Sequence, residues 1–203
     1  MIGFAEGTDE YFNWLSTLAP EGLSLLARQP DLPLAVRRDI VMMSQTSPET
    51  LDVLADGLDL SSKVQIARRP DALRSTLDRL AITTSATLMI TILRNTGTGP
   101  SGKTIAYLAT SSNTIVQELA ITHRNAPKRL IELSLNSDDP AIRTCVVYNP
   151  RLTARELEWL AKDEDERVSK AAKERLCCVL GGSLDRQPSS QKADTKFLTA
   201  QNR

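Results

Sequence analysis

A leucine–alanine dipeptide, or a close variant of it, recurs through most of the chain roughly every 27 residues. The six instances are Leu26-Ala27, Leu54-Ala55, Leu80-Ala81, Leu108-Ala109, Leu133-Ser134 and Leu160-Ala161. A further apolar residue stands three or four positions before each leucine, on the same face of a helix: Leu23, Leu51, Leu77, Ile105, Leu130 and Leu157. A period of this length is typical of repeat proteins, and it constrains the fold more than any other feature of the sequence.

A second apolar anchor follows each dipeptide after eight to ten residues and opens another short amphipathic segment. These anchors are Val36, Val64, Leu88, Val116, Ile142 and Val168. Several second segments end in turn residues such as Asn149-Pro150, because proline cannot continue a helix. Helix starts are also marked: Ser47 is an expected N-cap before Pro48, and Thr153 with Glu156 forms a capping box. One unit is therefore predicted to be helix, short turn, helix, turn.

Six such units fill roughly residues 19 to 176 of the 203-residue chain. Neither helix of a unit can bury its apolar face alone, so neighbouring units must stack into a continuous core. The chain has only 2 Trp, 3 Tyr and 3 Phe, which is unusual for a β-sandwich and ordinary for packed helices. We therefore expect an all-α fold, an α-solenoid of about six short two-helix repeats. The alternative is a non-repetitive helical bundle.

The segments that carry this pattern are Leu157-Glu-Trp-Leu-Ala-Lys-Asp, Ile142-Arg143 and Asn149-Pro150. Together they resemble the leucine-rich repeat variant family, and more broadly HEAT-like and armadillo-like repeats. The resemblance implies pairs of short helices, the second sometimes a 3₁₀-helix, in a right-handed superhelix. Some members of that family carry a cysteine-rich iron–sulfur segment. No cysteine precedes Cys145 in this chain, so we expect no such cofactor.

The two ends differ from the repeats. Half of the aromatic residues fall within the first 14 positions: Phe4, Tyr11, Phe12 and Trp14. We interpret residues 1–18 as an aromatic N-terminal cap helix that covers the first repeat, although an aromatic docking patch is the alternative. Residues 19–180 form the predicted repeat array. Residues 181–203 begin with Gly181-Gly182 and continue as a polar segment that we expect to be a disordered tail.

Composition and targeting signals indicate a cytoplasmic protein. The 25 basic and 25 acidic side chains balance, which argues against a generic polybasic nucleic-acid binder. The N-terminus has no basic, apolar leader, and the apolar run at residues 86–93 is too short to span a membrane. Cys145, Cys177 and Cys178 have neither metal-ligand spacing nor a disulfide framework, so we expect reduced thiols.

Residues 97–104, Gly-Thr-Gly-Pro-Ser-Gly-Lys-Thr, match the Walker A pattern in full. In a true phosphate-binding loop Lys103 would contact the β- and γ-phosphates and Thr104 would hold Mg²⁺. However, the segment falls on a turn between two predicted helices, and no series of strands alternates with helices here. Pro100 also removes one N–H from the loop. We therefore rank phosphate binding by Gly97, Gly102, Lys103 and Thr104 as the third functional hypothesis.

No other motif favours an enzyme, a metal or a cofactor. His123 is the single histidine, which excludes a multi-histidine metal site and leaves a catalytic triad without support. We expect it to cap helix carbonyl groups at the end of its unit. The acidic run Asp163, Asp165 and Glu166 lacks the glycine and distal glutamate of an EF-hand loop, so a solvated turn is the better interpretation.

Charge is unevenly distributed, since residues 1–70 hold 6 basic and 10 acidic side chains. Basic residues cluster near the ends of second helices: Arg68, Arg69, Arg94, Arg124 and Lys128-Arg129. Aligned along a superhelix, they would form a basic ridge similar to the DNA-binding face of HEAT-like DNA glycosylases. The simpler explanation is that cations are favoured at helix C-termini.

The function that we favour from the sequence is a non-catalytic protein–protein interaction scaffold whose partner is another protein. Candidate contact residues are second-helix positions, namely Arg37, Lys63, Gln117, Arg143 and Arg167. Nucleic-acid binding along the basic ridge is the second hypothesis.

Overall fold

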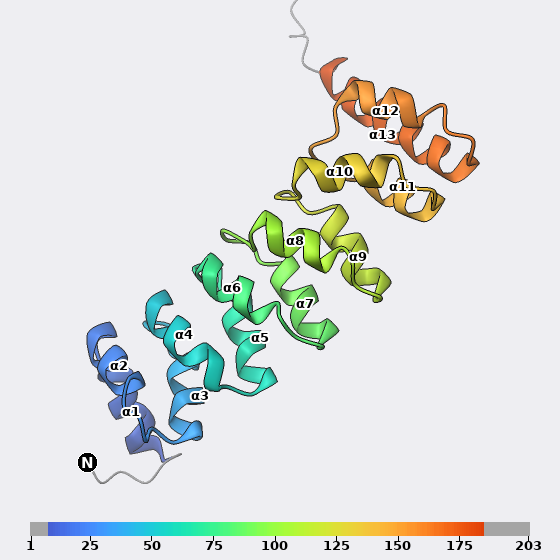
Figure 1. Cartoon of the computed structure of the whole chain (residues 1–203). Helices are drawn as coiled ribbons and strands as arrows, with labels where there is room; N and C mark the ends of the chain where they lie inside the picture. Colours follow the sequence, from blue (N-terminus) through green and yellow to red (C-terminus); the bar gives the residue numbers. More distant parts are fainter. Residues whose placement is uncertain (1–7, 185–203) are drawn as a thin grey trace, which may run out of the picture.

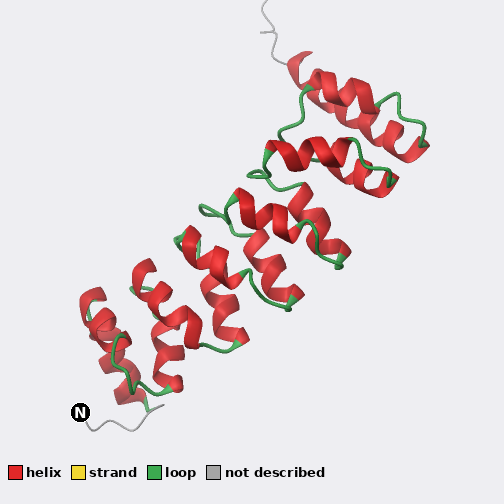
Figure 2. Cartoon of the chain, in the orientation of Figure 1, coloured by secondary structure: helices red, strands yellow, loops and turns green. Residues whose placement is uncertain are grey.

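The computed structural model describes residues 8–184, and every regular element in that range is helical (Figure 2). The elements are α1 Asp9–Thr17, α2 Pro20–Ala27, α3 Leu34–Met42, α4 Pro48–Leu54, the 3₁₀ turn η1 Ala55–Gly57, α5 Leu60–Arg68, α6 Arg74–Leu80, α7 Ala86–Leu93, α8 Gly102–Leu108, α9 Thr114–Ile121, α10 Lys128–Leu135, α11 Pro140–Val147, α12 Ala154–Leu160 and α13 Glu166–Leu184. The all-α class expected from the sequence is confirmed.

The helices lie in two rows along an elongated body (Figure 1). We call α2, α4, α6, α8, α10 and α12 the first-row helices, and α3, α5, α7, α9, α11 and α13 the second-row helices. Each second-row helix packs against the next one of its row, from α3 to α13. Contacts between successive first-row helices are sparser, so this side of the body is the more open one.

Helix starts are fixed by local side-chain caps. Ser47 accepts the N–H of Thr50, and Thr153 and Glu156 bond reciprocally in a capping box, as the sequence predicts. Side-chain caps also begin α5, α7, α8, α9 and α11. Apart from α13, each helix has only seven to nine residues, which is too short to be stable alone in water. Stability must therefore come from packing between helices.

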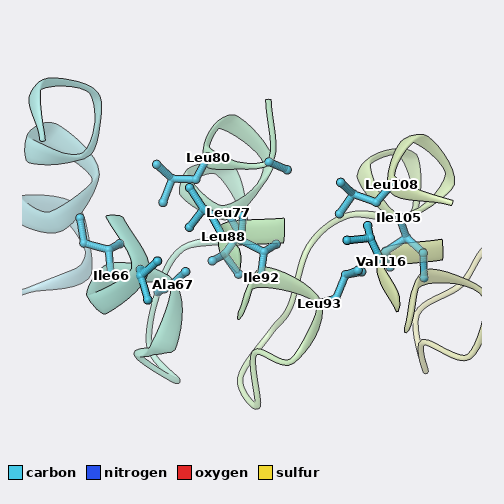
Figure 3. Packing of buried hydrophobic residues seen from close by; sticks show 14 of the residues in the cluster. Ile66, Ala67, Leu77, Leu80, Leu88, Ile92, Leu93, Ile105, Leu108 and Val116 are labelled. Atoms are coloured by element: carbon cyan, nitrogen blue, oxygen red, sulfur yellow. The ribbon is translucent and has the colours of Figure 1, made fainter. Parts of the chain in front are cut away.

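The predicted anchors Leu77, Leu88, Ile105 and Val116 are buried together with neighbouring apolar residues (Figure 3). The fifth unit departs from the predicted register by one residue. Leu133 is exposed, whereas Ile131, Ser134 and Leu135 are buried. In the other units a large residue precedes a small one, as in Leu54-Ala55, whereas in this unit the small Ser134 precedes the large Leu135. The predicted match of Leu133-Ser134 to Leu-Ala was therefore wrong by one residue. With Ser134 in place of Leu133, the inner positions of the first-row helices are more evenly spaced than predicted: Leu26, Leu54, Leu80, Leu108, Ser134 and Leu160.

The two ends of the described range contain helix. In α1, Tyr11 and Leu15 are buried, and the Tyr11 hydroxyl donates to the Asp39 carboxylate of α3 at 3.0 Å. Phe12 of the same helix is exposed, so the aromatic residues divide between the two interpretations of this segment. At the other end α13 continues through Gly181, where the sequence predicts a turn. Phe4 and the predicted tail beyond residue 184 lie outside the described residues.

Candidate functional site

Two positions that recur along the helices stand out, one at the contact between successive helix pairs, which we call units, and one on the open side. The first lies one or two residues beyond the ends of α5, α7, α9 and α11, or at the equivalent place inside the long α13. We call the residues there the joint residues: Arg69, Asn95, His123, Asn149 and Arg175. They are spaced by 26 or 28 residues, and each bonds to the main chain of the unit before it.

The asparagine joints show the arrangement most completely. The Asn95 side-chain amide donates to the carbonyl oxygens of Ala67, at 2.8 Å, and Arg69, at 2.9 Å. Its own oxygen accepts the N–H of Gly97 at 2.9 Å. Asn149 makes the same set of bonds two units on, beginning with the carbonyl of Ile121. One asparagine side chain thus bonds carbonyl groups at the end of one helix and fixes the turn that leads into the next helix.

His123 occupies the joint between the two asparagines. Its Nδ1 accepts the N–H of Asn125 at 3.0 Å, and its ring bonds to the backbone of Leu93 in the preceding unit. Burial of the imidazole lowers its pKa below the ordinary value of 6.5, and the neighbouring charge of Arg124 adds to that effect. His123 therefore caps a carbonyl of the preceding second-row helix and serves the role of an asparagine amide.

The arginine joints also bond carbonyl groups of the preceding unit, with a longer side chain. Arg69 donates to the carbonyl oxygens of Met43, at 3.1 Å, and Thr46, at 2.9 Å. Arg175 donates to that of Asn149 at 2.7 Å, and burial lowers the pKa of its guanidinium. Arg69 is therefore occupied within the molecule, although the sequence suggested it as a ridge residue.

The Walker A-like loop is occupied by internal contacts. The helix α7 precedes it where a phosphate-binding fold would have a strand. Inside the loop the N–H of Ser101 donates to the Asp78 carboxylate at 2.8 Å, and that of Gly97 donates to a joint asparagine. A Cβ on Gly97 would lie 1.7 Å from the carbonyl oxygen of Pro70. Two N–H groups that a phosphate would need are thus already bonded, while Lys103 is exposed on α8.

Loop length explains why the Walker A pattern appears here. The interval from Ser85, the N-cap of α7, to Ser101, the N-cap of α8, can be compared with that in the next unit. It is two residues longer than the interval from Asn113 to Pro127, the N-caps of α9 and α10. The loop is therefore the ordinary turn between units with a two-residue extension.

The second notable position lies on the open side, on the first-row helices. Five of its six residues are large apolar side chains that are each 47% to 68% exposed, and we call them the outer apolar row: Leu25, Val53, Tyr107, Leu133 and Trp159. The sixth position holds Arg79, which pairs with Asp52 at 3.1 Å. Each residue immediately precedes the inner position of its first-row helix, so aligning the units in the correct register would have revealed the row in the sequence.

Surface hollows lie beside both ends of the outer apolar row. Two of them, of about 510 and 280 Å³, share the lining residues Trp159, Leu135 and Asn136. A third, of about 430 Å³, is lined by Leu25 and Glu21 among others. The exposed apolar side chains therefore border concave surface into which a partner could place its own side chains.

The second-helix candidates from the sequence do not form one surface. Arg143 is buried and pairs with the Asp163 carboxylate through two bonds, of 2.8 and 2.9 Å. Hydrogen bonding to this guanidinium holds the pKa of Asp163 below its usual range. Arg37 donates to the carbonyl oxygens of Leu32 and Pro30. Both arginines are therefore engaged inside the molecule.

Arg167 is exposed and pairs with Asp165, whose pKa this contact lowers to about 2. Lys63 and Gln117 are half-buried at equivalent positions of α5 and α9. These three polar residues thus lie on separate second-row helices.

Some residues of the predicted basic ridge are exposed, and others are hydrogen-bonded within the chain. Arg68 and Arg94 are exposed at equivalent ends of α5 and α7. Arg124 donates to the carbonyl oxygens of Gly97 and Thr96, the latter at 3.3 Å. The structure therefore brings two of the ridge arginines to one surface and uses Arg69 and Arg124 to hold loops.

Comparisons with known proteins give no relative for this chain: no family model matches it, and no curated protein or solved structure matches it either. Within residues 8–184, no helix combines the length and apolar character needed to cross a bilayer. The same range contains no group of three His, Cys, Asp or Glu side chains placed to hold a metal ion.

Proposed function

We propose that the chain is a right-handed α-solenoid of six two-helix repeats, related to the leucine-rich repeat variant and HEAT-like families, and acts as a non-catalytic protein-binding scaffold in the cytoplasm. The two rows of helices and the regular spacing of the joint residues support the repeat architecture. In such an architecture each unit contacts only its neighbours, which leaves long surfaces free for a partner.

The outer apolar row is the single observation that carries the binding function. Large exposed apolar side chains recur at one repeat position from α2 to α12, so together they follow the length of the body. Scattered apolar residues on a surface need no explanation, but large ones that recur at one position of successive helices favour an interaction surface. Tyr107 and Trp159 add the aromatic character that is enriched at the centres of protein interfaces.

Nucleic-acid binding along the second-row helices is the second candidate, and the exposed pair Arg68 and Arg94 is the observation that favours it. Two arginines neutralise few phosphates, so binding through them alone would be weak and would fall as salt rises. The two candidates therefore use different sides of the molecule and can be separated by mutation.

The test compares a variant of each side. The triple variant Tyr107→Ser, Leu133→Ser, Trp159→Ser removes the larger part of the outer apolar row, and Arg68→Ser, Arg94→Ser is the matched control. Immobilised protein is exposed to a lysate of the cells that express it, and captured proteins are quantified by mass spectrometry. We expect the control to retain the proteins captured by the unmodified chain and the triple variant to lose them. Capture that depends on Arg68 and Arg94 instead would overturn the assignment to the outer side.

A further inference from the structure

Charged side chains accompany the outer apolar row, one helical turn before most of its members. The six positions are occupied by Glu21, Glu49, Ser75, Lys103, Arg129 and Arg155. Residues four apart on a helix share one face, so these side chains lie beside the row. The charge therefore changes sign along the open side, from acidic at α2 and α4 to basic at α8, α10 and α12.

The basic half is unexpected from local helix energetics. Lys103, Arg129 and Arg155 are each the second residue of their helix, where the macrodipole favours acids. Glu21 and Glu49 lie in comparable first turns and agree with the dipole. Three consecutive first-row helices thus carry an exposed cation at a position where their own macrodipoles disfavour one.

The outer apolar row of one copy complements that of a second copy that runs in the opposite direction. Turning a second row end to end places the Leu25 position against that of Trp159 and the Val53 position against that of Leu133. Arg79 then faces Tyr107, an arrangement suited to a cation–π contact.

The charged positions pair in the same reversal. Glu21 faces Arg155, Glu49 faces Arg129, and the uncharged Ser75 faces Lys103. Acidic positions thus meet basic ones wherever both carry a charge, without any adjustment of register.

We propose that the outer apolar row binds a second copy of this chain in an antiparallel, two-fold symmetric dimer; this inference rests on the protein-binding function proposed above. A two-fold interface uses the same patch on both subunits, so the patch must complement itself. The outer apolar row does so in both apolar content and charge. The two-fold axis then passes between α6 and α8, which meet the α8 and α6 of the second copy.

The experiment measures the mass of the full chain by sedimentation equilibrium over a range of concentrations. We expect a dimer, with twice the chain mass of 22.3 kDa. Two charge-reversal variants follow: Glu21→Arg, Glu49→Arg in the acidic half, and Arg129→Glu, Arg155→Glu in the basic half. Each variant alone brings like charges together and should raise the dissociation constant at least about tenfold. An equimolar mixture of the two variants should form a heterodimer of near-original affinity, since opposite charges then meet at both ends.

A matched control reverses two cations on the other side, Arg68→Glu and Arg94→Glu, and should leave the dimer intact. Circular dichroism melts check that every variant is folded. A chain that stays monomeric at all concentrations would overturn the second-copy inference, and so would a dimer that ignores both reversals or a mixture that fails to associate. A monomeric chain whose Tyr107, Leu133 and Trp159 variant still loses captured proteins would keep the protein-binding function and overturn only the second copy as its partner.

Discussion

The joint residues and the outer apolar row recur at the same spacing but have opposite relations to the fold. At the joint, residue identity changes between arginine, asparagine and histidine, while the hydrogen bonding to the preceding unit is kept. On the outer side the apolar character is kept at five of six positions, although these side chains remain largely exposed. The joint is explained by contacts within the chain, whereas the outer apolar row has few such contacts and is the surface that we propose for a partner.

The difference shows what a repeat position has to provide. A joint residue must present a donor to carbonyl groups at a helix end, because an unsatisfied buried carbonyl is costly. Several side chains can do this. An outer residue must offer apolar area to something outside, so its chemistry is restricted while its contacts within the chain are few.

The largest effect is expected from breaking a joint. Asn149→Ala removes two bonds to carbonyl groups and one from the Arg151 N–H at a site with no solvent exposure. We expect a loss of about 3 kcal/mol in the free energy of unfolding, read as a fall in Tm of roughly 10 °C. Trp159→Ser on the outer side is the matched control, and an equal fall for both variants would erase the distinction between the two positions.

A close backbone contact at the joint should give the next largest effect. Gly97→Ala places a methyl group onto the carbonyl of Pro70, so the turn must move and break its bond to Asn95. We expect a loss of about 2 kcal/mol. Gly102→Ala, at the start of the first-row helix α8, meets only ordinary contacts of 3.6 Å and should be neutral or stabilising, because alanine favours helix. Thermal melts of the two variants compare these sites directly, and a Gly102→Ala loss as large as that of Gly97→Ala would contradict the assignment.

The histidine joint should add a dependence of stability on pH. The pKa of His123 is lower in the folded chain than the ordinary value of 6.5, so the unfolded chain binds the proton more readily. Stability is therefore fully present above pH 6.5 and declines as the pH falls below that value. Asparagine is the residue at two other joints, so His123→Asn is the matched variant. Its Tm should differ less between pH 7.5 and pH 5.5 than the Tm of the unmodified chain. Carboxylates such as Asp165, with a pKa of about 2, respond only at lower pH. An unchanged pH dependence in His123→Asn would refute this role for the imidazole.

The smallest effect on stability is expected on the outer side. Tyr107→Ser and Leu133→Ser remove exposed side chains, so the free energy of unfolding should change by no more than about 0.5 kcal/mol each. Urea titrations followed by circular dichroism measure this change. A loss of about 2 kcal/mol in either variant, the size expected for a buried or strained position, would mean that the outer apolar row supports the fold. Its assignment to a partner would then be weaker.

Much of the fold could be predicted from local sequence. The apolar spacing at Leu23, Leu51 and Leu77 predicts buried helix faces, and Ser47 and Thr153 predict helix starts, because these signals act within one or two turns of chain. The register of the fifth unit was wrong because Leu133 resembles a core residue by its type alone.

The candidate sites were less predictable. Arg143 and Arg69 resemble surface cations in the sequence, yet their partners, Asp163 and the carbonyl of Met43, lie 20 and 26 residues away. No spacing within one helix indicates such contacts.

The sequence by itself therefore determined the helical class, the spacing of the buried apolar residues and the helix caps, since periodicity and capping are properties of short segments. The tertiary structure decided which of the recurring residues are used internally and which face outward. That choice depends on what the preceding unit presents at each position, a helix-end carbonyl for Asn95 and open surface for Leu25. Burial and hydrogen bonding between units are set only when the two units pack together.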